Sequence, residues 1–176
     1  MATVVAANYG RIMREGDLTP NAAIKTLEAI AAQRTAEARG EAPFIGTYIP
    51  NSPAEREQAG ICDIDIVQAV EYYRTPRGQA AGSPNKLRFS GLAPAVGFDA
   101  FHLADQLLTQ PLHIVVGENI GAFGSYRDGF ELFGKAASKE KQIVVVPNTS
   151  HYDLYDKPDA VDVALKGIVP FFEKFL

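Results

Sequence analysis

The sequence is short of cysteine and of basic residues. Cys62 is its single cysteine, which excludes an intramolecular disulfide and fits a reducing compartment. Its 17 lysines and arginines stand against 21 acidic residues, for a formal net charge of −4. Because binding to nucleic acid needs a basic surface, we expect no nucleic-acid partner.

Long apolar runs are also missing. No stretch of the sequence approaches the roughly 18–20 apolar residues that span a bilayer. The N-terminus lacks the basic segment that opens a signal peptide, so we expect a cytoplasmic protein without a membrane partner. The 3 histidines and the single cysteine show no metal-ligand spacing. No glycine-rich phosphate loop follows a predicted strand, so neither a metal nor an organic cofactor is expected.

The C-terminal part of the sequence alternates strand and helix patterns. Apolar runs at 112–116 and 142–146 predict strands that are buried on both faces. The segments 125–137 and 158–175 have the apolar spacing of amphipathic helices. This order predicts a parallel sheet with helical crossovers. The short apolar run Thr3–Asn8 predicts a further strand, so the expected sheet has about three strands.

Residues 11–108 have a different pattern and predict a mostly helical insertion between the first strand and the C-terminal unit. The pair Thr19-Pro20 predicts the start of its clearest helix, which Gly40 can end. Other parts of the insertion are predicted as short helices at 11–15, 64–73 and 98–108, and as irregular chain at 41–53 and 75–85. Residues 1–10 and 109–176 then form the sheet core of a single domain, 1–176.

Two loops leave the carboxyl ends of predicted strands, where open parallel sheets form their sites. They are Gly117–Ser125 and Pro147–Asp153. The segment Ser150-His151-Tyr152-Asp153-Leu154-Tyr155-Asp156 resembles the histidine motif of α/β-hydrolases in the dienelactone-hydrolase-like branch, which includes fungal polyketide-transferase-like proteins. Segments of the same branch are also similar to this chain at 33–40, 72–79 and 121–129, so the resemblance runs along essentially the whole chain.

The resemblance implies a partial α/β-hydrolase fold, with a short parallel sheet, flanking helices and a helical lid insertion. It also implies a triad of nucleophile, histidine and acid, in which His151 is the general base. Relatives carry the acid at about the place of Gly121. Glu118 is the nearest carboxylate in this chain and our first candidate for the acid, and Asp128 is the second. The other histidines are predicted to be structural: His113 as a hydrogen-bonded core residue, and His102 on a helix of the insertion.

The nucleophile of such a triad is not found in this sequence. The first five strands of the family and its nucleophile elbow would precede Met1, and no Gly-x-Ser-x-Gly occurs around any serine. Cys62 follows Gly60-Ile61 but is itself followed by Asp63, which does not suit the strained turn of an elbow. We expect Cys62 to be a small hydrophobe in lid packing. An enzyme using Cys62 and His151 is a weaker alternative that thiol labelling would test.

We therefore expect the C-terminal half of a hydrolase of esters, thioesters or lactones, inactive by itself. A small-molecule acyl substrate would bind only when an N-terminal half completes the site. The alternative is a non-enzymatic, oligomeric interaction module derived from a hydrolase. In both interpretations neither charge nor proline protects the edge of the Thr3–Asn8 strand, so we expect a homo-oligomer, or a complex with an N-terminal half, through that edge.

Overall fold

The computed structural model describes residues 1–15 and 22–176. The predicted helix start at Thr19-Pro20 lies outside the described residues. The described chain divides into two compact units, and each is treated by itself. Unit 1 comprises Met1–Asn8, Asp63–Gln68 and Phe101–Leu176, and unit 2 comprises Tyr9–Cys62 and Ala69–Ala100.

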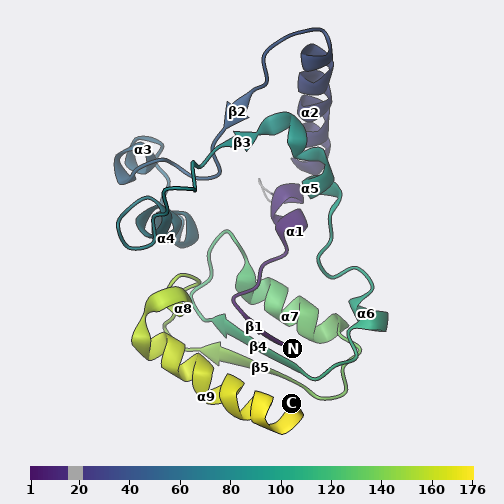
Figure 1. Ribbon diagram of the computed structural model, residues 1–176, viewed down its shortest axis with the longest axis vertical. Helices are drawn as coiled ribbons and strands as arrows, with labels where there is room; N and C mark the ends of the chain where they lie inside the picture. The colour runs from purple at the N-terminus through teal and green to yellow at the C-terminus, as the bar shows by residue number, and fades with distance from the viewer. Residues whose placement is uncertain (16–21) are drawn as a thin grey trace. The chain divides into compact units, whose positions relative to one another are not determined.

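A three-stranded parallel sheet forms the centre of unit 1 (Figure 1). Its strands, in spatial order, are β1 (Ala2–Val4), β4 (Leu112–Gly117) and β5 (Lys141–Val146). Ile114 of β4 pairs with Thr3 on one side and with Ile143 on the other. Every residue of β4 is buried, as its unbroken apolar run predicts for a central strand. The predicted fold class, a short parallel sheet with flanking helices, is confirmed.

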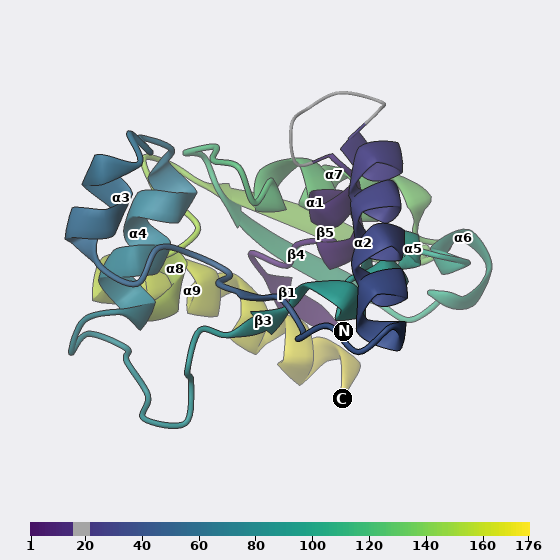
Figure 2. The same cartoon turned by 90° about the horizontal axis from the view of Figure 1, so that it is seen from above.

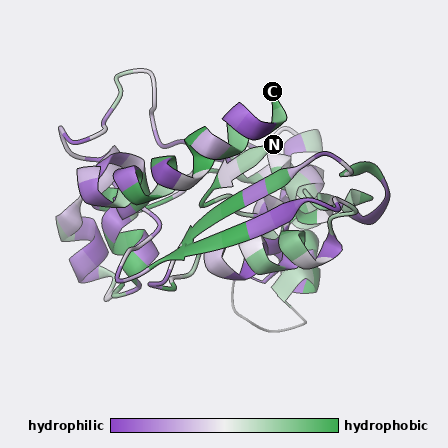
Figure 3. Ribbon diagram, turned by 90° about the horizontal axis from the view of Figure 1, so that it is seen from below, coloured by the Kyte–Doolittle hydropathy of each residue, from purple (hydrophilic) through white to green (hydrophobic). Residues whose placement is uncertain are grey.

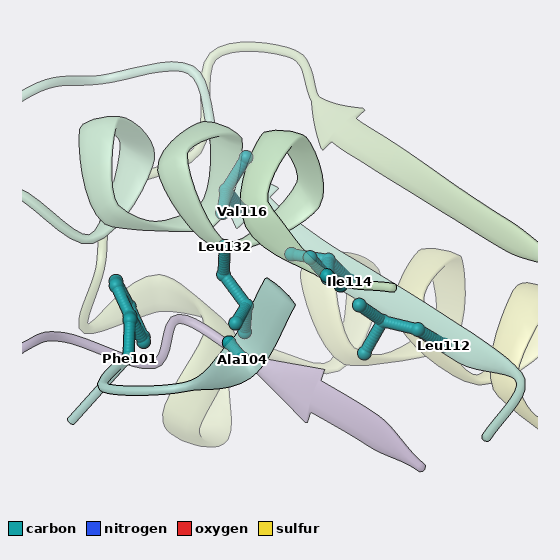
Figure 4. Packing of buried hydrophobic residues seen from close by; sticks show 7 residues of the cluster. Phe101, Ala104, Leu112, Ile114, Val116 and Leu132 are labelled. Carbon is teal, nitrogen blue, oxygen red and sulfur yellow. The ribbon is translucent and has the colours of Figure 1, made fainter. Parts of the chain in front are cut away.

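Two helices cover the sheet of unit 1 on opposite faces (Figure 1). Helix α7 (Ser125–Lys135) brings Leu132 against one set of alternate β4 residues, shown in Figure 4: Leu112, Ile114 and Val116. Helix α9 (Pro158–Phe175) brings Ala160 and Ala164 against the other face, which includes Val115. Figure 3 shows the hydrophobic colour running along the C-terminal halves of β4 and β5. Burial on both faces therefore anchors the ends of the strands from which the two loops leave.

The first strand is shorter than predicted. It ends at Val4 because Val5 has a φ of 43°, a left-handed conformation that turns the chain out of the ladder. The Val5 N–H still donates to the Val115 carbonyl at 2.9 Å. Beyond it, the Asn8 N–H donates to Oδ2 of Asp128 at 2.7 Å, and both residues are buried. The prediction of a strand over Thr3–Asn8 is therefore wrong after Val4. Beyond β1, the buried carboxylate of Asp128, not a neighbouring strand, accepts the Asn8 N–H.

Of the predictions for His113 and His102, the structure confirms the first and contradicts the second. His113 in β4 is completely buried, and its Nδ1 lies in hydrogen-bonding distance of the Gln142 side chain, so its prediction as a core residue is confirmed. His102 is wrong as a helical residue, because it lies in a turn before α6 (Ala104–Leu107). Leu103, with a φ of 58°, interrupts the helix predicted over 98–108.

The regular elements of unit 2 are mostly helices. Figure 2 shows its long helix α2 (Ala22–Ala38) beside α1 (Tyr9–Arg14) and α5 (Ala93–Gly97). Ile30, Leu92 and Val96 form its buried core. Across residues 1–15 and 22–176, no helix combines the length and the apolar character needed to cross a bilayer.

Several short elements of unit 2 were not predicted from the sequence. Helix α3 (Pro53–Gln58) begins where irregular chain was predicted, and its start has a signal, since Ser52 Oγ accepts from the Glu55 N–H. The antiparallel pair β2 (Ile45–Gly46) and β3 (Leu87–Arg88) has two residues in each strand, too few for a visible pattern, and a 3₁₀ turn at Phe89–Gly91 follows β3. Helix α4 (Ile64–Tyr73), which runs through both units, has the predicted bounds.

We predict that Asp128→Ala destabilises the protein. The buried Asn8 N–H would lose its carboxylate acceptor, which costs about 2 kcal/mol for a hydrogen bond to a charged group. Urea denaturation should show a lower midpoint with an unchanged slope. Asp128→Asn is the matched control, because its amide oxygen can still accept the bond, and it should lose less. Equal midpoints for wild type and Asp128→Ala would show that this bond does not hold the chain after β1.

Candidate functional site

The loops after β4 and β5 are joined at the carboxyl end of the sheet. The Asn119 N–H donates to the Thr149 carbonyl at 2.9 Å, and the Asn148 N–H donates to Oε2 of Glu118 at 2.8 Å. Gly117 allows this approach, because a Cβ at that position would lie 2.3 Å from the Thr149 carbonyl oxygen. The chain therefore brings together the two loops that the sequence singled out.

A reciprocal pair of hydrogen bonds holds the turn that carries His151. The Ser150 N–H donates to Oδ2 of Asp153 at 3.0 Å, and the Asp153 N–H donates to Oγ of Ser150 at 3.1 Å. Asp153 opens α8 (Asp153–Asp156) and forms an ion pair with Lys157 at 2.7 Å. Burial is the largest single influence on Asp153 and would raise its pKa, but the hydrogen bonds from Lys157 and Ser150, together with the Lys157 charge, outweigh burial and lower that pKa. The turn is thus closed by a charged, well-bonded carboxylate.

The His151 imidazole is 7% exposed and has a hydroxyl on each nitrogen. Nδ1 lies 3.1 Å from Oγ of Ser125, the first residue of α7, and Nε2 lies 3.0 Å from the hydroxyl of Tyr155. The ring of Phe123 packs edge-on against the imidazole, with centroids 5.8 Å apart, and the ring of Tyr152 lies at 5.0 Å. Both loops and α8 therefore contribute to the surroundings of His151.

Burial lowers the pKa of the His151 imidazole from 6.5 to about 4. The imidazole is therefore neutral at pH 7, and one of its two ring nitrogens carries no proton. The two hydroxyls carry no charge, so they supply no opposite charge against the cost of charging the ring. A neutral imidazole has the protonation state of a general base, but a pKa this low makes it a weak one. A nearby carboxylate would raise its basicity.

The two predicted acids are bonded elsewhere in the described structure. Glu118 is exposed and accepts from the Asn148 N–H, whereas Asp128 is buried and accepts from the Asn8 N–H. Neither of these two described carboxylates is hydrogen-bonded to His151, whose polar partners are Ser125 and Tyr155. The assignment of either residue as the triad acid stays a prediction.

Two other carboxylates, missed by sequence reasoning, hold the loop after β4. Oδ2 of Asp63 accepts from the Ala122 N–H at 3.0 Å, and Oδ2 of Asp65 accepts from the Phe123 N–H at 2.8 Å. Burial raises the pKa of Asp65 to about 6, while the Phe123 N–H opposes that rise. The sequence does show these two carboxylates, as an Asp-x-Asp pair at the start of α4. They were not considered for the site because this segment was assigned to the insertion. Tyr155 also had a signal, four residues after His151 on the way into α8.

Cys62 does not have the environment that was expected. Its side chain is exposed, so the prediction of a small hydrophobe in packing is wrong. Its thiol has only a weak contact with the Gly60 carbonyl, at 3.6 Å. For metals, residues 1–15 and 22–176 contain no group of three or more histidine, cysteine, aspartate or glutamate side chains that could hold an ion.

Comparison with known protein sequences finds uncharacterized relatives. The chain is 32% identical over 176 residues to the uncharacterized protein YcjY of Escherichia coli (strain K12), covering all of this chain and 56% of YcjY. It is 27% identical over 183 residues to the uncharacterized protein PA2218 of Pseudomonas aeruginosa, covering 99% of this chain and 46% of PA2218. The chain thus spans about half the length of these curated relatives. No family model matches it.

Solved structures share the fold of this chain. The crystal structure of the hypothetical protein PA2218 superposes with a TM-score of 0.79 at 23% identity, over 99% of this chain and 53% of that structure. The crystal structure of the α/β hydrolase GrgF from Penicillium sp. sh18 superposes with a TM-score of 0.60 at 15% identity, over 99% of this chain and 55% of GrgF. The chain therefore has the fold of about half of an α/β-hydrolase.

Proposed function

We propose that this chain is the C-terminal part of a hydrolase of ester, thioester or lactone bonds, from the dienelactone-hydrolase-like branch, with His151 as its general base. One observation carries the proposal: a neutral imidazole lies at the carboxyl end of a parallel sheet, between the loops after β4 and β5. Ligands bind at this end of open α/β sheets. The fold shared with GrgF and the Ser-His-Tyr-Asp segment add support.

The two ring nitrogens of His151 have separate roles in this proposal. In a triad, Nδ1 faces the acid and Nε2 takes the proton of the nucleophile, then passes it to the leaving group. Tyr155 contacts Nε2 in this chain, so its hydroxyl has to turn aside, or relay the proton, when a nucleophile approaches. Ser125 contacts Nδ1, so Glu118 in the loop after β4, or Asp128 in α7, would supply the acid only after leaving the N–H group that it binds in this structure. The nucleophile comes from an N-terminal part, because this sequence has no elbow motif.

The rest of the chain is assigned roles that follow from the same proposal. Residues 11–108 form a lid insertion, and residues 1–10 and 109–176 form the sheet core of one domain. The substrate is a small acyl compound, bound only in the completed enzyme. The single cysteine supports a cytoplasmic location.

A chimera tests the hydrolase proposal. The chain replaces the 176 matching residues of YcjY, and p-nitrophenyl esters, an acyl thioester and a lactone are assayed. We expect turnover by the chimera and none by the chain alone. His151→Ala in the chimera should lower kcat by about 10²–10⁴-fold, the usual contribution of a general base.

Unmodified YcjY shows which substrates apply, and His102→Ala is the matched control, since this exposed histidine lies in a turn of unit 1. A chimera that keeps full turnover after His151→Ala would contradict the role of His151. Robust turnover by the chain alone, abolished by the same substitution, would place the nucleophile within this chain.

The pKa of His151 gives a second prediction. NMR titration of the imidazole should show a midpoint near pH 4, because burial disfavours the charged ring. The unfolded chain takes up this proton near pH 6.5 and the folded protein only near pH 4, so the free energy of unfolding should fall as the pH drops between these values. The loss is about 3.5 kcal/mol at most, at about 1.4 kcal/mol per pKa unit.

The His151→Gln variant should lack this acid-side loss of stability. A titration midpoint between pH 6 and 7 in the wild type would instead show that the imidazole is solvated.

The edge of the sheet favours a second candidate function, that of an oligomeric interaction module. Within the described residues, β1 has a strand partner only on its β4 side. Val4 at the end of this strand is 38% exposed, and neither charge nor proline protects the edge. Unprotected edges pair with other chains by strand addition. The partner would be a second copy of the chain or an N-terminal half of the fold.

Light scattering on the purified chain tests whether it associates with itself through the β1 edge. We expect a dimer or larger assembly at tens of micromolar protein, and a shift towards monomer in Val4→Lys, because a charge on an edge strand opposes pairing. Lysine at Val169, an exposed apolar residue on α9, is the matched control and should leave the assembly intact. A stable wild-type monomer would rule out association through β1.

A further inference from the structure

The carboxylate of Asp65 occupies the space beside Gly121. A Cβ at Gly121 would lie 2.3 Å from Cγ of Asp65 and 2.5 Å from its Oδ2, so the absent side chain of the glycine makes room for the carboxylate. Asp65 is the second residue of α4, 56 positions earlier in the chain. The loop after β4 is therefore built around a carboxylate that another segment supplies.

Asp65 is buried at a cost to folding. Its side chain is 1% exposed, and its Oδ1 has no hydrogen-bond partner in the described structure. The other oxygen, Oδ2, accepts from the Phe123 N–H at 2.8 Å. A buried charge with one unsatisfied oxygen is unfavourable, so its presence needs a structural or functional reason. Burial raises the pKa of this carboxyl to about 6, which is a physical mark of that cost.

The segment that Asp65 holds is also the segment that surrounds His151. Phe123, whose N–H binds Asp65, places its ring edge-on against the imidazole at 5.8 Å. Two residues later, Ser125 places its Oγ 3.1 Å from Nδ1. A shift of the backbone at Phe123 would move both groups away from His151. Asp65 binds the backbone of this loop, so its effect on the imidazole passes through Phe123 and Ser125.

We propose that Asp65 is a positioning residue for His151, acting through the 121–125 loop. The proposal rests on the proposed function only in assigning His151 a catalytic role. Asp65 fixes the backbone of Phe123, and Phe123 and Ser125 then exclude water from the imidazole and orient it. Glu118 and Asp128 hold other parts of the backbone, because they accept from the N–H groups of Asn148 and Asn8.

Three variants test the proposal by NMR of the His151 ring. Asp65→Ala removes the acceptor and should raise the pKa of His151 by at least one unit towards 6.5, with loss of the contact between the Phe123 and His151 rings. Asp65→Asn keeps an acceptor oxygen and should preserve both the pKa, within half a unit, and the ring contact. Gly121→Ala should act like Asp65→Ala, because its Cβ displaces the carboxylate. Asp105→Ala, which removes an exposed carboxylate of unit 1, is the charge-matched control and should change neither readout.

The outcomes separate this proposal from the proposed function. An unchanged His151 ring in both Asp65→Ala and Gly121→Ala overturns the role of Asp65, whatever the activity. If Asp65→Ala does not fold, Gly121→Ala and Asp65→Asn decide, and loss of the ring contact in Asp65→Asn also counts against the proposal. In an active chimera, Asp65→Ala should lower kcat at least tenfold with little change in KM. An inactive chimera argues against the hydrolase proposal, but the NMR measurements of the His151 ring still test the role of Asp65.

Discussion

The close approach of two backbones at Gly117 is the constraint on which the surroundings of His151 depend. The Thr149 carbonyl lies where a side chain at Gly117 would be, and it accepts from the Asn119 N–H. This contact places the turn that carries His151 against the loop that carries Phe123 and Ser125. Burial of β4 between α7 and α9 then keeps the two strand ends in register, because each face of the strand has its own apolar cluster.

Desolvation shifts the pKa of two ionisable groups at this end of the sheet, in each case by disfavouring the charged form. It lowers the pKa of His151 to about 4 and raises that of Asp65 to about 6. The Phe123 residue lies between them, with its N–H on the carboxylate and its ring on the imidazole. Ionisable groups with shifted pKa values, joined through one short loop, are typical of functional sites. The hydrolase and positioning proposals both depend on this arrangement.

Elements with a strong local pattern agree with their prediction. The central strand β4 is an unbroken apolar run, α9 has an amphipathic pattern behind Pro158, and α4 has the predicted bounds. The failures occur where a single residue or a distant partner decides. Val5 takes a left-handed conformation and ends β1 early, and Leu103 does the same to the helix predicted over 98–108. Neither residue type favours that conformation, so no local signal could show it.

The sequence by itself determined the α/β class, the parallel sheet and the two loops at the carboxyl end of that sheet, because buried strands and amphipathic helices have a local periodicity. It also singled out His151, through the segment Ser150–Asp153 after the last strand. Only the tertiary structure decided which groups surround that imidazole. The hydroxyls of Ser125 and Tyr155 lie beside its two nitrogens, and Asp65 binds the 121–125 loop from a helix that was assigned to the insertion. These contacts join residues far apart in the chain, and the chain path that brings them together has no periodic signature in the sequence.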